Sequence, residues 1–229
     1  MSLILQIETA TTSCSIALAE NGQVLAAREL NERNVHAEVV TVFTQEVVKE
    51  AGKTMDQLDA VAVSSGPGSY TGLRIGVSTA KGLCYALDKP LIAIETLEAM
   101  AAGFKAGYAG LTENTLLCPM IDARRMEVYT ALFDSNGSRV TPTSAEIIDE
   151  NSFANFLAAQ QVIFFGDGAS KCKAVLAHQP NAVIVDDFIN SAKYLTEGAL
   201  KRFNEGRFED VAYFEPFYLK DFIAGKKAL

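Results

Sequence analysis

The order of predicted elements constrains this chain most, because the same order occurs twice. An acidic residue at the end of an apolar stretch precedes an Asn-Gly pair in each half: Glu8 precedes Asn21-Gly22, and Asp122 precedes Asn136-Gly137. Asn-Gly between alternating apolar residues indicates a tight hairpin, because both central positions of a type I′ turn need positive φ angles. The sequence therefore predicts two hairpins at matching places in a duplicated fold.

The first half reads as three strands followed by alternating helices and strands. In chain order, we expect strands Leu3–Ile7, Ser13–Ala19 and Val24–Leu30, a helix from Asn34 as N-cap to Gly52 as stop, a short helix opened by the capping box Thr54–Gln57, strand Asp59–Ser64, a helix over Leu73–Leu87, strand Leu91–Ile94 and a helix capped by Thr96 that reaches about Lys105. A meander extended by parallel βα units is typical of a ribonuclease-H-like half.

The second half repeats this order more weakly. We expect strands Thr115–Ile121, Met126–Phe133, Ser138–Thr141 and Gln161–Phe165, and a helix capped by Ser191 that reaches about Asn204. The sequence thus predicts an α/β protein of the actin/hexokinase (ASKHA, ribonuclease-H-like) class, built from two similar βββαβαβα halves. We place these halves at residues 1–105 and 106–229, with the last segment packing back on the N-terminal half.

The charge of the chain limits its partners. The net charge is −8 and the pI is about 4.9. An acidic surface repels phosphate backbones, so the chain is a poor candidate for gripping nucleic acid by itself. Any contact with tRNA is therefore expected to be indirect, through a partner.

No motif for a metal, a cofactor or a membrane is found. The two histidines, His36 and His178, are far apart, and the four cysteines form no CxxC pair. These patterns predict no metal ligands, no cofactor and buried, reduced cysteines. The N-terminus lacks a basic region, and no apolar run approaches the roughly 20 residues that a membrane helix needs. We therefore expect a cytoplasmic protein.

Glu8 and Asp122 occupy the places where actin-like ATPases hold a metal-bound phosphate. A working phosphate loop adds glycines, so that backbone N–H groups can approach the anion. Here the turns are Thr9-Ala10-Thr11 and Ala123-Arg124-Arg125, without a glycine. We therefore interpret the pair as a vestigial nucleotide cleft with no catalytic residue.

The most distinctive loop lies between the strand 59–64 and the helix 73–87. Gly72 is followed by Leu73-Arg74, so the loop lacks the Lys and Ser or Thr of a Walker motif. Its glycines permit special φ angles and close backbone approach, which fits either a tight turn or a recognition surface. The residues of this signature loop are Gly66, Pro67, Gly68, Ser69, Tyr70, Thr71 and Gly72.

Two helices of the first half have unusual surfaces. The helix 34–51 has apolar residues on two sides, which suggests that a second surface is also covered. The helix 73–87 contains Gly76 and Gly82, and a glycine inside a helix costs roughly 1 kcal/mol relative to alanine. Such glycines predict close packing of the helix, either within the subunit or against a partner.

Five stretches together resemble the bacterial TsaB (YeaZ) family. They are Ser64–Gly76, Ile7–Thr11, Asp122–Arg124, Glu127–Tyr129 and Pro216–Lys220. They span nearly the whole chain in the order of the family. One departure is Glu8, where members of the family usually carry Asp.

The resemblance implies a non-catalytic subunit of the complex that transfers a threonylcarbamoyl group to the adenosine next to the anticodon, in tRNAs that read codons starting with A. It implies pairing with the catalytic paralogue TsaD, an ATPase partner TsaE, and a homodimer when the subunit is alone. In the family, the first two helices of the N-terminal half form this interface. The candidate interface residues are Val39, Val42, Phe43, Glu46, Arg74, Ser78, Lys81 and Gly82.

Two other functions remain as alternatives. A free-standing small-molecule kinase or ATPase of the same fold would bind ATP with magnesium through Glu8 and Asp122. A peptidase would need an activated nucleophile or a metal, and two isolated histidines provide no coherent triad.

Overall fold

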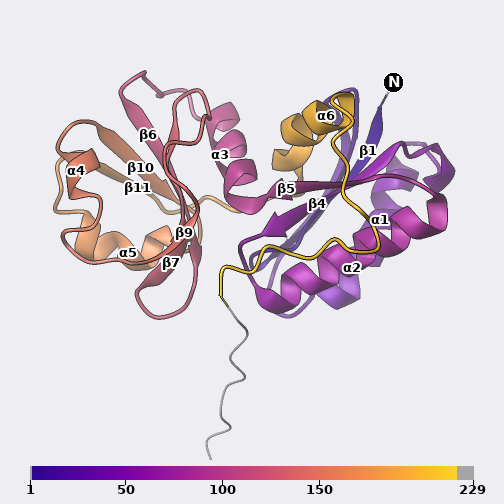
Figure 1. The fold of residues 1–229 in the computed structure, drawn as a ribbon, viewed down its shortest axis with the longest axis horizontal. Coiled ribbons are helices and arrows are strands. Elements are labelled where there is room, and N and C mark those ends of the chain that lie inside the picture. Colours follow the sequence, from indigo (N-terminus) through magenta and orange to yellow (C-terminus); the bar gives the residue numbers. More distant parts are fainter. Residues whose placement is uncertain (1, 221–229) are drawn as a thin grey trace, which may run out of the picture.

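The chain folds around two β-sheets that lie side by side, as seen in a computed structural model that describes residues 2–220 (Figure 1). The first sheet has the order β3-β2-β1-β4-β5, formed by Gln23–Asn31, Ser13–Glu20, Leu3–Glu8, Ala60–Gly66 and Leu91–Glu95. The second has the order β11-β10-β6-β7-β9, formed by Ala182–Val185, Gln161–Phe165, Thr115–Asp122, Glu127–Thr130 and Ser144–Ile147, and β8 (Phe133–Asp134) also pairs with β6.

Both sheets combine an antiparallel meander with parallel strands. β1 pairs antiparallel with β2 and parallel with β4, and β6 pairs antiparallel with β7 and parallel with β10. The two sheets therefore have the same strand order, in which β3, β2, β1, β4 and β5 of the first correspond to β9, β7, β6, β10 and β11 of the second. This match confirms the duplication that the sequence predicts, including the parallel extension of each meander.

Helices cover both faces of the first sheet. One face packs on α1 (His36–Glu50) and α2 (Tyr70–Leu87). The other packs on α3 (Thr96–Gly107) and, from the end of the chain, on the 3-10 helix η2 (Ala192–Leu195) and α6 (Thr196–Asn204). A further 3-10 turn, η1 (Met55–Gln57), leads into β4.

The second sheet is covered by shorter helices. Its outer face packs on α4 (Ala154–Leu157) and α5 (Ala169–Leu176), and its inner face packs on α3. Because α3 contributes buried residues to the cores of both halves, it joins them. The boundary at residues 105 and 106 stays a prediction, and residues 221–229 of the predicted second unit lie outside the described residues.

The two Asn-Gly pairs form different turns. Asn21 and Gly22 have φ angles of 50° and 82°, so the first hairpin has the predicted left-handed pair. At the second, only Gly137 is left-handed, and the carboxylate of Asp134 accepts hydrogen bonds from the backbone N–H groups of Asn136 and Ser138 at 2.9 and 2.8 Å. The predicted second hairpin forms, since Phe133 and Arg139 pair antiparallel, but its turn is not type I′ because the Asp134 side chain organises the loop.

The third strand of the second half lies further along the chain than predicted. Instead of Ser138–Thr141, the strand is β9, which begins at Ser144 after Pro142. Proline has no backbone N–H, so it interrupts ladder pairing and delays the strand. The predicted strand Met126–Phe133 is also divided, into β7 and β8, because the backbone of Leu132 bonds with Val140 and Thr141 instead.

Two of the predicted helix caps are wrong. Helix α1 has Val35 as its N-cap residue, and Asn34 precedes it in a left-handed conformation with φ of 65°. Thr96 is the first residue of α3, and its buried hydroxyl makes no hydrogen bond with the described residues. The capping box at Thr54 and the cap at Ser191 are confirmed.

The described residues can be checked for membrane helices, metal ligands and paired cysteines, none of which the sequence predicts. Residues 2–220 include no helix that is both long enough and apolar enough to cross a membrane. Within the same range, no group of three His, Cys, Asp or Glu side chains could hold a metal ion. All four cysteines are free and buried, as predicted.

Candidate functional site

The two acids at the ends of β1 and β6 make the same local hydrogen bond. Glu8 Oε1 accepts from the backbone N–H of Ala10 at 2.6 Å, and Asp122 Oδ1 accepts from the backbone N–H of Arg124 at 2.8 Å. Each carboxylate therefore closes its own turn, two residues ahead. One oxygen of each carboxylate is therefore already hydrogen-bonded to the backbone of its own turn.

Glu8 is completely buried, which changes its acidity. Burial removes the hydration of the charged form and raises the pKa of Glu8 from its ordinary value near 4.5 to about 7. The bond from Ala10 and the nearby side chains of Ser64 and Asn190 lower this pKa, although neither side chain reaches hydrogen-bond geometry with the free Oε2. A carboxyl group that is about half protonated at neutral pH is a weaker ligand for a magnesium ion than a fully ionised one.

Asp122 is accessible but already paired. Its side chain is 48% exposed, and Lys171 Nζ forms an ion pair with it. The following turn contains Arg124 and Arg125 with φ angles of 71° and 48°, a left-handed conformation that is uncommon without glycine. The turn is therefore held by the Asp122 carboxylate and carries no glycine backbone for an anion to approach.

A small cavity lies between the ends of the two sheets. It has a volume of about 40 Å³ and is lined by Ser13, Asp167 and Asn190, among others. Ligand pockets commonly have volumes of about 300–1,000 Å³. This cavity is thus smaller than a nucleotide pocket, and the vestigial cleft of Glu8 and Asp122 stays a prediction.

The signature loop packs tightly on the turn that follows β1. A Cβ atom on Gly68 would lie 2.3 Å from the carbonyl oxygen of Ala10, and one on Gly72 would lie 2.1 Å from that of Thr9. The Ser69 N–H donates to the Ala10 carbonyl at 2.7 Å, and the Ser69 side chain accepts from the Gly72 N–H as the N-cap of α2. The glycines therefore serve close approach within the subunit.

Gly76 and Gly82, further along α2 than Gly72, have different surroundings. A Cβ on Gly76 would lie 2.2 Å from the hydroxyl of Thr9, so this glycine also serves packing within the subunit. A Cβ on Gly82 would meet nothing within 4 Å among the described residues. The sequence predicts that these glycines serve close packing, either within the subunit or against a partner. Packing within the subunit explains Gly76 but does not explain Gly82.

The last described segment, residues 207–220, is called the C-terminal strap here. It leaves α6, passes across the first sheet and runs along α2 towards the other half (Figure 1). The Glu209 N–H donates to the Leu91 carbonyl and the Phe217 N–H to the Ser65 carbonyl, while Lys220 forms an ion pair with Glu127 of β7. The strap therefore connects the two halves over the signature loop.

An aromatic group forms where the strap meets the signature loop. The rings of Tyr70 and Tyr218 have centroids 4.9 Å apart, and the guanidinium of Arg74 lies 4.5 Å from the centroid of the Tyr70 ring. This cation–π contact fixes Arg74 at the exposed start of α2. Arg74 thus presents its charge next to the strap.

Lys81 holds the strap from the middle of α2. Its Nζ donates to the carbonyl oxygens of Ala212 and Phe214 at 3.1 and 3.0 Å. We expect Lys81→Ala to lower the free energy of unfolding by about 1 kcal/mol, because two partly exposed charge-assisted hydrogen bonds are lost. Limited proteolysis should then cut the strap faster, whereas Ser78→Ala, an exposed position on the same helix, should not. Equal cutting rates in the two variants would contradict this role of Lys81.

The outer surfaces of α1 and α2 expose several of the candidate interface residues. Val42 is 48% exposed, and the side chain of Glu46 is 46% exposed and paired with Arg28 of β3. By contrast, Val39 and Phe43 are partly buried and pack on the core of the first half. Arg74, Ser78 and Gly82 are exposed on α2.

One exposed aromatic residue was missed by the sequence-based list. Tyr85 is 87% exposed on α2. Its spacing from Arg74, Ser78 and Lys81 follows the helical repeat, so it lies on the same stripe. A tyrosine on the polar face of an amphipathic helix is the sequence pattern that could have predicted this exposed residue.

Comparisons with known proteins agree along the chain. A family model described as TsaD, tRNA N6-adenosine threonylcarbamoyltransferase, matches residues 23–227. The tRNA threonylcarbamoyladenosine biosynthesis protein TsaB of Escherichia coli (strain K12) is 32% identical over 233 residues, which cover 98% of this chain and 97% of that protein.

Solved structures give the same picture. YeaZ from Pseudomonas aeruginosa matches with a TM-score of 0.81 and 26% identity, over 96% of this chain and 100% of that one. The activator of 2-hydroxyisocaproyl-CoA dehydratase from Clostridium difficile matches with a TM-score of 0.51 and 11% identity, over 90% of this chain and 96% of that one. The second match shows the fold alone, and the predicted fold class is confirmed.

Proposed function

Because the chain belongs to the TsaB (YeaZ) family, we propose that it is the non-catalytic subunit of the complex that adds the threonylcarbamoyl group to the adenosine next to the anticodon, in tRNAs that read codons starting with A. It pairs with TsaD, which carries the catalytic site, and it works in the cytoplasm. TsaE joins the pair as an ATPase, and the chain forms a homodimer when TsaD is absent.

Three observations support the non-catalytic assignment. Glu8 is buried with a raised pKa, Asp122 is paired with Lys171, and the cavity nearby has a volume of about 40 Å³. Neither acid is free to hold a metal-bound phosphate, so this site supports no phosphoryl transfer. The alternative of a free-standing kinase or ATPase is not favoured for the same reason.

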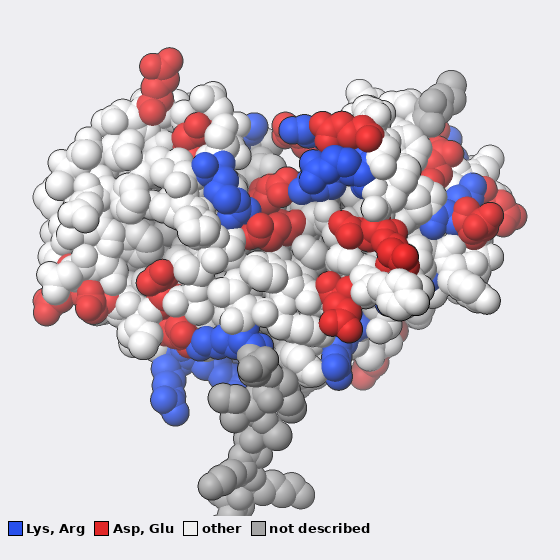
Figure 2. All heavy atoms as spheres, in the orientation of Figure 1, with Lys and Arg blue, Asp and Glu red and all other residues white. Residues whose placement is uncertain are grey.

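The charge of the surface supports indirect contact with tRNA. On the face seen in Figure 2, basic side chains occur in small groups close to acidic ones, with large uncharged areas between them. With a net charge of −8, such a surface gives little of the phosphate attraction on which tRNA binding depends. TsaD is thus the partner that holds the tRNA.

We place the TsaD interface on the outer stripe of α1 and α2. Val42 and Tyr85 are its accessible anchors, and Glu46, Arg74, Ser78 and Gly82 surround them. Large exposed side chains are the usual hot spots of an interface once they are covered by a partner. Gly82 lets a partner backbone approach α2, since no atom of the described residues lies against it.

Val42→Glu and Tyr85→Glu should each weaken association with TsaD by about 2 kcal/mol or more, or about 30-fold in Kd. The measurement is titration of TsaD by calorimetry, with circular dichroism to check that each variant folds. Ile147→Glu is the matched control, because Ile147 is 74% exposed on β9 of the other half. If the control weakened association as much as the two helix variants, the interface would be misplaced.

The activity assay tests the assignment as a whole. TsaD, TsaE, ATP and a supply of threonylcarbamoyl-adenylate are combined with tRNA, with and without this chain. We expect transfer only when the chain is present, and we expect it to survive Glu8→Gln combined with Asp122→Asn. Loss of transfer in the double variant, with association intact, would instead assign a nucleotide site to this chain.

A further inference from the structure

The two halves differ most in the helix that follows the third strand. In the first half, α1 has 15 residues and buries Val40, Val47 and Val48 over the meander strands. In the second half, the corresponding helix α4 has 4 residues, of which only Leu157 is buried. A sheet face that carries one full helix in the first half therefore carries a single turn in the second.

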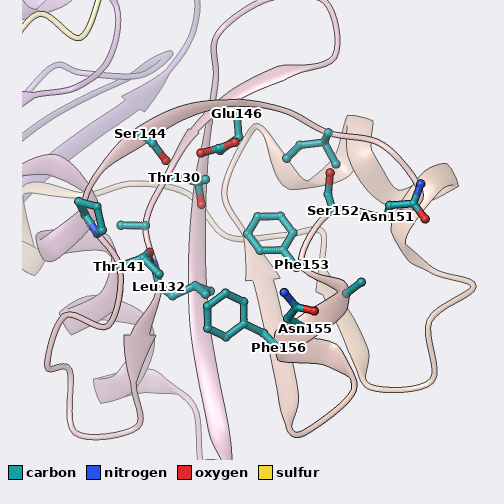
Figure 3. Close-up of a pocket in the computed structure, with 14 residues that line it drawn as sticks. Thr130, Leu132, Thr141, Ser144, Glu146, Asn151, Ser152, Phe153, Asn155 and Phe156 are labelled. Carbon is teal, nitrogen blue, oxygen red and sulfur yellow. Dashed lines mark hydrogen bonds between the residues drawn. The ribbon is translucent and has the colours of Figure 1, made fainter.

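A pocket of about 450 Å³ lies beside this short helix (Figure 3). Its floor is apolar and is formed by Leu132, Ile148, Phe153 and Phe156. These four residues belong to or pack on the outer core of the second half, the counterpart of the core that α1 covers in the first. The pocket thus occupies the place over β7 and β9 that α1 fills over β2 and β3.

The strand register places polar side chains on the same face. Thr130 of β7 lies opposite Ser144 of β9, and Val128 lies opposite Glu146. Because residues directly opposite each other share a face, Ser144 and Glu146 point to the side on which Val128 is buried. Figure 3 shows both side chains above Phe153, around the mouth of the pocket.

Glu146 gives the pocket its charge. It is the only charged residue that lines the pocket, and its carboxylate makes no hydrogen bond or ion pair within residues 2–220. An occupant that fits must therefore carry apolar groups for the phenylalanines and a cation for Glu146. Lysine or arginine on an amphipathic helix provides both, with apolar side chains at positions i, i+3 and i+4.

We propose that this pocket binds a basic amphipathic helix of a partner chain, in the place that α1 holds in the first half. The first half is the internal template for this packing, since α1 lies over β2 and β3 of an equivalent sheet. The site lies in the second half, apart from the stripe of α1 and α2. The chain can therefore bind two partners at once, and failure of one interface leaves the other intact.

The probe is a fluorescent 15-residue peptide with the sequence of α1, in which Glu38, Glu46 and Glu50 are replaced by lysine. Anisotropy with the full chain should show saturable binding. Glu146→Lys should weaken the Kd about tenfold, because attraction becomes repulsion. Glu150→Lys makes the same charge change at a residue outside the pocket lining and should change the Kd less than twofold.

Ser144→Trp fills the pocket and should also raise the Kd of the peptide about tenfold. Circular dichroism checks that this variant folds. If it does not fold, the result for Glu146→Lys still decides the question. The peptide with the unchanged acidic sequence should bind at least tenfold more weakly. Absence of saturable binding at millimolar peptide, or binding that neither Glu146→Lys nor Ser144→Trp weakens, would overturn the proposal. So would binding of phenethylamine in the pocket without binding of the peptide, which would assign the site to a small amine.

Discussion

Gly72→Ala is expected to destabilise the protein by about 3 kcal/mol, the size of a severe packing defect. The new Cβ would lie 2.1 Å from the carbonyl oxygen of Thr9. That oxygen belongs to the backbone of the turn after β1, so no side chain rotation can relieve the clash. The measurement is the free energy of unfolding from urea denaturation at pH 7.

Gly82→Ala is the matched control within the same helix. Its Cβ would meet nothing within 4 Å, so alanine should raise stability by about 0.5–1 kcal/mol through its better helix propensity. The two variants should therefore move stability in opposite directions. Similar effects of both substitutions would show that α2 does not depend on close approach to Thr9.

The second large effect concerns the proton of Glu8. Burial raises its pKa from near 4.5 to about 7, so the folded protein holds this proton more tightly than the unfolded chain. The contribution of Glu8 to stability is therefore fully present below about pH 4.5 and is lost as pH rises through 7. At about 1.4 kcal/mol for each pKa unit, the loss between pH 5 and pH 8 is about 2–3 kcal/mol.

Glu8→Gln removes the charge and keeps an oxygen for the N–H of Ala10. The stability of this variant relative to the natural chain should rise by about 2–3 kcal/mol from pH 5 to pH 8. Urea denaturation at both pH values measures the difference, in which the titration of the other carboxyl groups cancels. A constant difference between Glu8→Gln and the natural chain would mean that Glu8 is charged in the folded protein.

These two predictions concern one junction. Glu8 ends β1 and Thr9 follows it, Gly72 and Gly76 lie in the first two turns of α2, and the strap crosses the loop between β4 and α2. Helix α2 also carries part of the proposed interface with TsaD. The packing that fixes α2 therefore also fixes the stripe on which a partner would rest.

Local patterns in the sequence were enough to predict the order of the elements and much of the local turn chemistry. Asn21 and Gly22 form their hairpin through the conformations of two adjacent residues, and the capping box at Thr54 needs only residues three apart. The duplication was visible for the same reason, since periodicity and turn residues are properties of short segments. The family signature over Ser64–Gly76 was equally local.

Properties that depend on distant residues could not be predicted in this way, because they arise from packing in the folded chain. Burial under the rest of the fold raises the pKa of Glu8. Lys81, which we predicted to lie in an interface, instead donates hydrogen bonds to the carbonyl oxygens of Ala212 and Phe214. The second Asn-Gly hairpin does not form a type I′ turn, because the Asp134 carboxylate accepts hydrogen bonds from Asn136 and Ser138 of the loop. The pocket beside α4 arises because one helix of a duplicated pair is short. Desolvation, hydrogen-bond partners across the chain and uncovered sheet faces are set by packing between segments, which no local pattern encodes.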